Sequence, residues 1–420
     1  MSISSEYRKY IQKFFEFLKW GWLIVPVSVA SGLIVSLFLW LLDKSTLTFQ
    51  SNHWLIFLMP LAGMLITWLY KHGKDSGKGN NLIIAAIQNP STKVPARMSP
   101  LILFTTVLTH LVGGSAGREG TAVQIGGSIA GLPFRFFQLE KYQQQVILRC
   151  GAAAGFGAVF GTPLAGAVFA IEFTRIGSIH WRSLFPCLLA ALLADQTVQI
   201  TGIDHTPYAI QFTTTTFSFL PFEPILLLKV MGAGMVFGLT ARLFVKVADG
   251  IKSTTQKFIP NPYLIVVAAS LLVWGISELL GTYDYLGLGV ESPNSNGISI
   301  LSSFQSNHID PLGWFWKLLL TAITLNLGFK GGEVTPLFFM GAALGHTLAA
   351  FAGAPVNLFA GLGLIAVFAG AANTPLACVV MGIELFGTEH WIYMLIACFA
   401  AFASSGKRGI YSAQEYGLNN

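Results

Sequence analysis

Two glutamates stand in glycine-rich segments of a chain that carries very little charge. Glu119 lies in GREGT, residues 117–121, and Glu333 lies in GGEVTP, residues 331–336. A carboxylate at the mouth of an anion site would compete with the anion, and its protonation would vacate the site. Such a group would couple the movement of an anion to that of a proton.

Two other interpretations of these glutamates remain open. Each could simply be a favourable partner for the positive end of a helix dipole, as glutamate often is in a first turn. The pair could also be the acid and base of an enzyme inside the membrane. An enzyme would need a nucleophile or a metal cluster, and the chain shows neither at recognisable spacing. We therefore expect a protein that is not an enzyme.

The composition is that of a membrane protein. Hydrophobic residues make up 53% of the 420 residues and charged residues 10%, against roughly 25% charged in soluble domains. The mean hydropathy is +0.63. Residues 20–42 carry no charge and are long enough for a helix of about 20 residues across a lipid bilayer. We expect an all-α polytopic membrane protein, in which an ionisable residue at membrane depth is a functional candidate.

The basic residues favour a membrane surface as partner, and no nucleic acid. The net charge is +6, but the lysines and arginines lie near the termini and at loop edges rather than in one stripe. Residues 1–20 mix basic and aromatic residues without the apolar core of a signal peptide, which predicts an amphipathic helix on the cytoplasmic surface. Lys407 and Arg408 favour the same side for the C-terminal segment.

An internal repeat divides the chain. GTPLAGAVFAIEF at 161–173 matches NTPLACVVMGIEL at 373–385, and GREGTAVQIGGSIAG at 117–131 can be laid on GGEVTPLFFMGAALG at 331–345. We expect a first membrane repeat over 21–205, a second over 206–406 and a C-terminal segment over 407–420. Because proline favours a helix start, residues 371–375 should break the long uncharged run around them into two helices.

Four irregular segments interrupt the apolar runs: residues 77–81, 113–120, 328–336 and 407–411. The first three precede helical patterns, so each offers unpaired backbone N–H groups at the positive end of a helix dipole. If they converge, they form an anion site without a full positive charge. The alternative is that small residues merely let helices pack closely. A duplicated chain with broken helices favours a transporter whose site lies between its halves.

Other motifs predict less. GKDSGKGNN at 73–81 resembles a phosphate loop, but its spacing is one residue short and Gly79 stands where Ser or Thr is needed. Glu172 and Glu384 end the duplicated helices, where a helix-end or subunit-contact role is at least as plausible as catalysis.

The histidines lack metal-binding spacing, and we expect no cofactor. The cysteines lie singly in apolar runs and should be reduced core residues; they are Cys150, Cys187, Cys378 and Cys398.

At these residues the sequence resembles the CLC family of chloride channels and anion/proton antiporters. GREG resembles the gating-glutamate motif of that family, GKGNN at 77–81 and GGEVTP occupy the places of its first and third anion loops, and KRGIYSA at 407–413 resembles its final segment. The resemblance implies a homodimer with one pore per subunit, built from two inverted repeats of tilted and broken helices. It implies no soluble regulatory domain. The implied anion-binding residues are Gly79, Asn80, Gly117, Gly120, Val334, Thr335 and Tyr411.

Departures from the chloride members indicate the substrate. Glu333 and Thr335 replace an apolar run in the third loop, which resembles the fluoride-exporting branch, as does Thr121. Phe173 stands where proton-coupled chloride members have a second glutamate. Lys78 and Asn80 in the first loop are unlike the fluoride branch. So is the helix after it, which offers aliphatic side chains where aromatic ones would be expected; they are Leu82, Ile83 and Ile84.

The resemblance implies a fluoride/proton antiporter of a bacterial plasma or inner membrane. It exports fluoride while protons enter, with Glu119 as the protonatable gate and Glu333 in the proton or anion pathway. A chloride/proton antiporter and a passive chloride channel remain the alternatives. For Arg118 we expect a structural or surface role.

Overall fold

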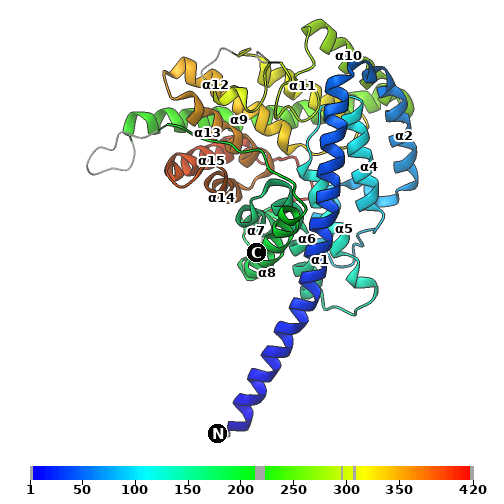
Figure 1. Ribbon diagram of the computed structural model, residues 1–420, viewed down its shortest axis with the longest axis vertical. Coiled ribbons are helices and arrows are strands. Elements are labelled where there is room, and N and C mark those ends of the chain that lie inside the picture. The colour runs from blue at the N-terminus through cyan, green and yellow to red at the C-terminus, as the bar shows by residue number, and fades with distance from the viewer. Residues whose placement is uncertain (1–2, 213–222, 295–296, 306–308, 417–420) are drawn as a thin grey trace.

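The computed structural model describes residues 3–212, 223–294, 297–305 and 309–416, which fold almost entirely into helices (Figure 1). The first half contains α1 Ile3–Ser51, α2 Met59–His72, α3 Asn80–Gln88, α4 Met98–Leu111, α5 Glu119–Ala130, α6 Lys141–Phe160, α7 Pro163–Glu172 and α8 Leu184–Ile200. The second contains α9 Pro224–Phe258, α10 Pro262–Leu280, α11 Gly313–Asn326, α12 Val334–Ala352, α13 Val356–Ala372, α14 Pro375–Phe386 and α15 Trp391–Ser405.

Short elements connect these helices. Short 3-10 helices are η1 His53–Leu58, η2 Lys74–Lys78, η3 Pro133–Arg135, η4 Trp181–Ser183 and η5 Ser302–Phe304. Two strands of two residues each, β1 Arg175–Ile176 and β2 Glu415–Tyr416, pair in parallel and tie the C-terminal segment to the first half.

The helices fit a membrane-spanning chain. Within the described residues, six stretches are long and apolar enough to cross a bilayer, and shorter apolar helices accompany them. The six are Trp20–Ser51, His53–His72, Trp181–Ile200, Pro224–Phe258, Pro262–Leu280 and Val334–Ala352. The expected all-α polytopic fold is confirmed.

The N-terminal segment differs from our expectation. Instead of a separate amphipathic helix ending near residue 20, one continuous helix, α1, runs from Ile3 to Ser51, and its first turns project away from the rest of the molecule (Figure 1). Nothing around residue 20 stops a helix, because Phe17, Leu18, Lys19 and Trp20 lead directly into the apolar span. Pro26 lies inside the helix without ending it.

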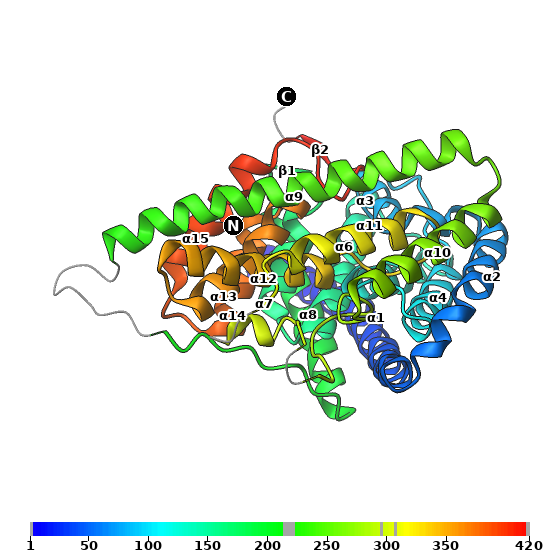
Figure 2. The same ribbon diagram turned by 90° about the horizontal axis from the view of Figure 1, so that it is seen from above.

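The two halves repeat the same packing. In the first half α4 packs on α5, α5 on α6, α6 on α7 and α7 on α8; in the second, α11 packs on α12, α12 on α13, α13 on α14 and α14 on α15. The long helix α9 crosses the second half and contacts α13 and α15 (Figure 2). The expected break at residues 371–375 is present, since α13 ends at Ala372, Asn373 adopts φ +56° and α14 begins at Pro375.

Backbone contact between helices fixes the positions of α5 and α12. A Cβ atom on Gly126 of α5 would lie 1.9 Å from the carbonyl oxygen of Gly151 on α6. The repeat-related contact is the same, because a Cβ on Gly341 of α12 would lie 2.0 Å from the carbonyl oxygen of Gly363 on α13. Only a hydrogen atom fits at these crossings, as at other close helix contacts in membranes.

Two buried or half-buried carboxylates connect the halves. Glu172, at the end of α7, accepts hydrogen bonds from the backbone N–H groups of Leu376 (3.1 Å) and Ala377 (2.8 Å) at the start of α14. Glu384, near the end of α14, accepts from Leu164 (2.9 Å) and Ala165 (2.7 Å) at the start of α7. Each helix therefore caps the other, which assigns these glutamates the helix-end role that was one of the two expectations.

We predict that Gly126→Ala lowers the free energy of unfolding by about 1–3 kcal/mol, because the added methyl forces α5 away from α6. The matched control is Gly275→Ala in α10, where a Cβ meets no atom within 4 Å. Thermal unfolding of the purified proteins in detergent provides the comparison. Equal melting temperatures for the two variants would contradict the close crossing.

Candidate functional site

The two glycine-rich segments of the repeat meet. The N–H of Gly117 donates to the carbonyl of Gly332 (2.6 Å), and the N–H of Gly332 donates to the carbonyl of Gly117 (2.8 Å), which forms an isolated antiparallel bridge. Helix α5 begins at Glu119 and helix α12 at Val334, directly after the bridge on each side. Two positive helix ends are thus brought together inside the protein, which meets for these two segments the condition set for an anion site.

The side chain of Glu119 accepts the hydrogen bonds that are offered at the start of α12. Its side chain is 1% exposed. The carboxylate accepts from the N–H of Thr335 (3.0 Å), from the Thr335 hydroxyl (2.5 Å to Oε1 and 2.7 Å to Oε2) and from the N–H of Arg118 (3.1 Å). Hydrogen bonds to an ionised acceptor are short and strong. The carboxylate therefore sits where a bound anion would find its donors.

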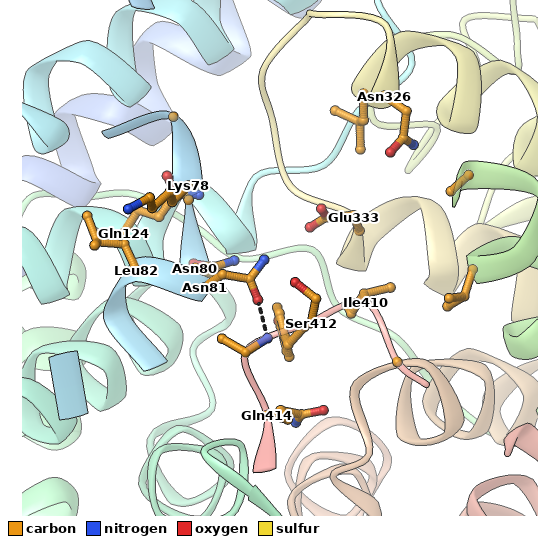
Figure 3. Close-up of a pocket in the computed structure, with 18 of the residues that line it drawn as sticks. Lys78, Asn80, Asn81, Leu82, Gln124, Asn326, Glu333, Ile410, Ser412 and Gln414 are labelled. Carbon is orange, nitrogen blue, oxygen red and sulfur yellow. Dashed lines mark hydrogen bonds between the residues drawn. The ribbon is translucent and has the colours of Figure 1, made fainter. Parts of the chain in front are cut away.

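A large cavity of about 1080 Å³ opens on one side of this point (Figure 3). Its lining includes Gly79, Asn80, Glu333 and Tyr411, so the first, third and final anion segments share one space. Five cations and two carboxylates line it, and the excess of positive charge attracts anions. The charged residues are Lys78, Lys252, Lys330, Lys407, Arg408, Asp249 and Glu333.

A small cavity of about 420 Å³ has the opposite character. Three carboxylates, Asp43, Asp284 and Glu291, line it together with Arg118 and two histidines. Of the structural or surface role that we expected for Arg118, the structure supports the structural one, because its Nε lies 3.6 Å from Oε1 of Glu119. Its backbone and its guanidinium thus both contact Glu119, while its side chain borders the small cavity. Glu119 lines neither cavity.

Tyr411 lies among aromatic side chains. It is 4% exposed, and its ring makes edge contacts with Phe169 and Phe173, with centroids 6.4 and 6.3 Å apart. Phe173, the residue in place of a second glutamate, also stacks on Phe169 at 4.8 Å. The position that holds an acid in proton-coupled chloride members is therefore filled here by a buried hydrocarbon ring beside the expected anion-binding tyrosine.

Glu333 and Glu119 have different environments despite their equivalent places in the repeat. Glu333 lines the large cavity (Figure 3), and a Cβ on Gly120 would lie 3.5 Å from its Oε2. The other expected anion-binding residues, Gly117, Val334 and Thr335, are all in the buried layer around the bridge. One carboxylate is thus held by donors at the bridge, and the other faces the large cavity.

The first loop contains an exposed ion pair. The Nζ of Lys78 lies 2.8 Å from Asp75, and both side chains are largely exposed. The hydrogen bond from Lys78 lowers the pKa of the Asp75 carboxyl. Lys78 therefore has a partner of its own at the edge of the large cavity.

Two buried basic residues that the sequence did not single out support the segment before Glu119. His110 bonds to it directly, and Lys317 bonds to Gly287, whose carbonyl accepts from the N–H of Ala116. Lys317 of α11 is fully buried, and its ammonium donates to the carbonyls of Gly287 (2.8 Å) and Tyr285 (3.1 Å). The ring nitrogens of His110 lie 2.8 Å from the carbonyl of Thr106 and 3.0 Å from that of Ala116. In the sequence, Lys317 could have been noticed as a single lysine in the apolar run around residues 312–328.

Comparison with known proteins agrees with this geometry. The model of the voltage gated chloride channel family matches residues 62–406. The chain belongs to this family, the CLC family. A relative named chloride/fluoride channel protein, from Pseudomonas syringae pv. tomato, is 43% identical over 406 residues, which are 95% of this chain and 87% of the relative.

Solved CLC structures share the fold. A CLC-type fluoride/proton antiporter superposes with a TM-score of 0.89 at 34% identity, over 96% of this chain and 99% of its own. A eukaryotic CLC transporter superposes with a TM-score of 0.73 at 17% identity, over 94% of this chain and 74% of its own. The inverted-repeat CLC fold expected from the sequence is therefore confirmed.

We predict that Thr335→Val lowers the free energy of unfolding by about 1.5–3 kcal/mol, because the buried carboxylate of Glu119 loses a charged hydrogen bond. In a Glu119→Ala background the same substitution should cost clearly less, since the acceptor is already gone. Thermal unfolding of the four proteins in detergent measures the coupling. The control is Thr347→Val near the other end of α12, whose hydroxyl donates to the carbonyl of Ala343 (3.0 Å). Identical losses in both backgrounds would contradict the Glu119–Thr335 contact.

Proposed function

We propose that the protein is a fluoride/proton antiporter that exports fluoride from a bacterial cell while protons enter. The observation that carries the proposal is the placement of the Glu119 carboxylate on the Thr335 and Arg118 donors, between a basic cavity and an acidic one. This position suits a gate that is removed by a proton. The cavity with the excess of cations is assigned to the cytoplasmic side, in keeping with the positive-inside rule.

Exchange follows from competition for the same donors. A proton from the small cavity neutralises the Glu119 carboxylate, and the neutral acid binds the Thr335 hydroxyl and N–H less strongly than the anion form. Its side chain then leaves these donors, and an anion from the large cavity takes them. When Glu119 releases its proton, the carboxylate returns and displaces the anion. Each movement of the anion is thereby linked to a protonation step.

Fluoride suits the donors of this site. It is small and strongly hydrated, and as a better hydrogen-bond acceptor than chloride it favours hydroxyl and backbone N–H groups such as those of Thr335 and Tyr411. The names of two relatives support this substrate, one as a chloride/fluoride channel protein and one as a fluoride/proton antiporter. We assign Gly79, Asn80, Gly117, Gly120, Val334, Thr335 and Tyr411 to the anion route.

The membrane potential would drive both halves of the exchange. Moving one elementary charge through 100 mV is worth about 2.3 kcal/mol. The exit of a fluoride ion and the entry of a proton both make the cell interior more positive. An inside-negative potential therefore favours fluoride export. We assign Glu333 to the proton or anion pathway on the large-cavity side, because Phe173 leaves no carboxylate at the usual inner position.

We also propose that the protein works as a homodimer with one pore per subunit, as implied by its family. Large apolar side chains on α7, α8 and α15 are exposed and could be covered by a second copy or by lipid. They include Leu164, Phe185, Leu192 and Trp391.

We predict that proteoliposomes containing the protein release fluoride at least about tenfold faster than chloride and take up protons as fluoride leaves. An ion-selective electrode and a pH-sensitive dye measure the two fluxes. Proton-coupled chloride release at an equal rate would identify a chloride/proton antiporter instead. Rapid chloride release without proton uptake would identify a passive channel.

We predict that Glu119→Gln reduces coupled fluoride/proton exchange by at least about a hundredfold, because the amide keeps the shape of the side chain but cannot carry the proton. The matched control is Glu389→Gln, a change of an exposed glutamate in the turn before α15. Normal exchange by the Glu119→Gln protein in the same assay would refute the assignment of the gate.

A further inference from the structure

Three buried polar side chains without partners gather at one wall of the large cavity. They are Ser76 of η2, Asn80 at the start of α3 and Gln124 of α5, with exposed fractions of 1%, 7% and 5%. Ser76 Oγ, Asn80 Oδ1 and Gln124 Oε1 have no hydrogen-bond partner among the described residues, and all three residues line the cavity. We call this group the amide corner. Because an unsatisfied buried polar atom is costly, such atoms point to a ligand or water.

The amide corner borders the gate. The Gln124 amide lies against Gly79, where a Cβ would be 3.6 Å from Nε2 and 3.8 Å from Oε1. A Cβ on Gly120, the residue after Glu119, would be 3.0 Å from Nδ2 of Asn80. Figure 3 shows Asn80 and Gln124 on the same side of the cavity, across from Asn326. An ion that moves from the cavity toward Thr335 therefore passes this wall.

Other amides in the same cavity differ, because they bond to the protein. Asn81 Oδ1 accepts from the N–H of Ala413 (2.9 Å), and Asn326 Nδ2 donates to the carbonyl of Ala322 (3.1 Å). Gln414 Nε2 donates to the carbonyls of Phe173 (2.9 Å) and Ala372 (2.8 Å). These amides hold the walls together, whereas the acceptor oxygens of the amide corner remain unused within the described chain.

Unused acceptors indicate what the corner binds. A carbonyl oxygen repels a bare anion but accepts a hydrogen bond from water, whereas an amide NH₂ group donates to an anion. A pair of amides can therefore hold an anion together with water that has stayed in its hydration shell. Bridging water contributes almost as much as a direct hydrogen bond when it has polar partners on both sides.

We propose that the amide corner holds a partly hydrated fluoride ion on its way to the Glu119 site, with Gln124 and Asn80 binding both the ion and its retained water. This rests on the proposed function. The amide corner lowers the free-energy cost of dehydrating fluoride, because the ion keeps part of its water until the donors of Thr335 become available. Gln124 thereby acts as a specificity-determining residue that favours a small, strongly hydrated anion over a larger one.

The test measures fluoride efflux from proteoliposomes as a function of internal fluoride for the wild type, Gln124→Met and Asn80→Leu. These substitutions keep side-chain size and remove the polar atoms. We expect the KM for fluoride to rise about tenfold in each, the effect of one lost hydrogen bond, with the proton-to-fluoride ratio unchanged. Chloride release should change less. The matched control, Asn326→Leu, alters an amide of the same cavity outside the corner and should leave the KM for fluoride unchanged.

Several results would overturn the inference. They are an unchanged KM in both variants, an equal rise in Asn326→Leu, or the same change for chloride as for fluoride. If the variants do not fold, a crystal structure of the wild type in fluoride decides, because it must show ordered water bonded to Asn80 or Gln124. Absence of fluoride/proton exchange by the wild type would instead refute the proposed function, so the two failures are distinguishable.

Discussion

The unpaired backbone N–H groups at the start of helix α12 need hydrogen-bond acceptors, and the surrounding structure supplies them. The first backbone N–H groups of α12 have no partners within the helix, and the residues around them are buried. The bridge between Gly117 and Gly332 holds the start of α5 beside it, so two positive helix ends share one small volume. An acceptor has to be present there at all times. The Glu119 carboxylate supplies it in this structure, and in the proposed exchange an anion takes its place.

The charges around the bridge are distributed unevenly. Cations dominate the large cavity and carboxylates the small one, with Arg118 beside the gate at the boundary. A field of this kind concentrates anions in the large cavity and cations, including protons, in the small one. Lys317 donates to the carbonyls of Tyr285 and Gly287 without a carboxylate partner among the described residues, and Gly287 in turn accepts from the N–H of Ala116. The site is thus organised by backbone dipoles as much as by charged side chains.

The sequence predicted the features that depend on local chemistry. Glycine and proline marked the helix breaks, the repeat placed Glu119 and Thr335 in related segments, and the structure brings these two into contact. The positions of Arg118 and Gln124 were not predictable, because a side chain's neighbours across a bridge or a cavity depend on tertiary packing. For the same reason the sequence placed Glu333 in the proton or anion pathway without showing that it faces the large cavity. The continuous helix α1 was missed because a basic and aromatic composition does not stop a helix.

The reciprocal caps of α7 and α14 restrict how such a protein can change its accessible side. Glu172 and Glu384 each fill the open end of the helix in the opposite repeat, so four backbone N–H groups depend on the halves keeping their present alignment. A rocking motion of one repeat against the other would leave these donors and two carboxylates unpaired. Rotation of one glutamate side chain breaks none of these bonds. On the mechanism proposed above, access is switched by a few atoms of the Glu119 side chain while the caps of α7 and α14 stay in place.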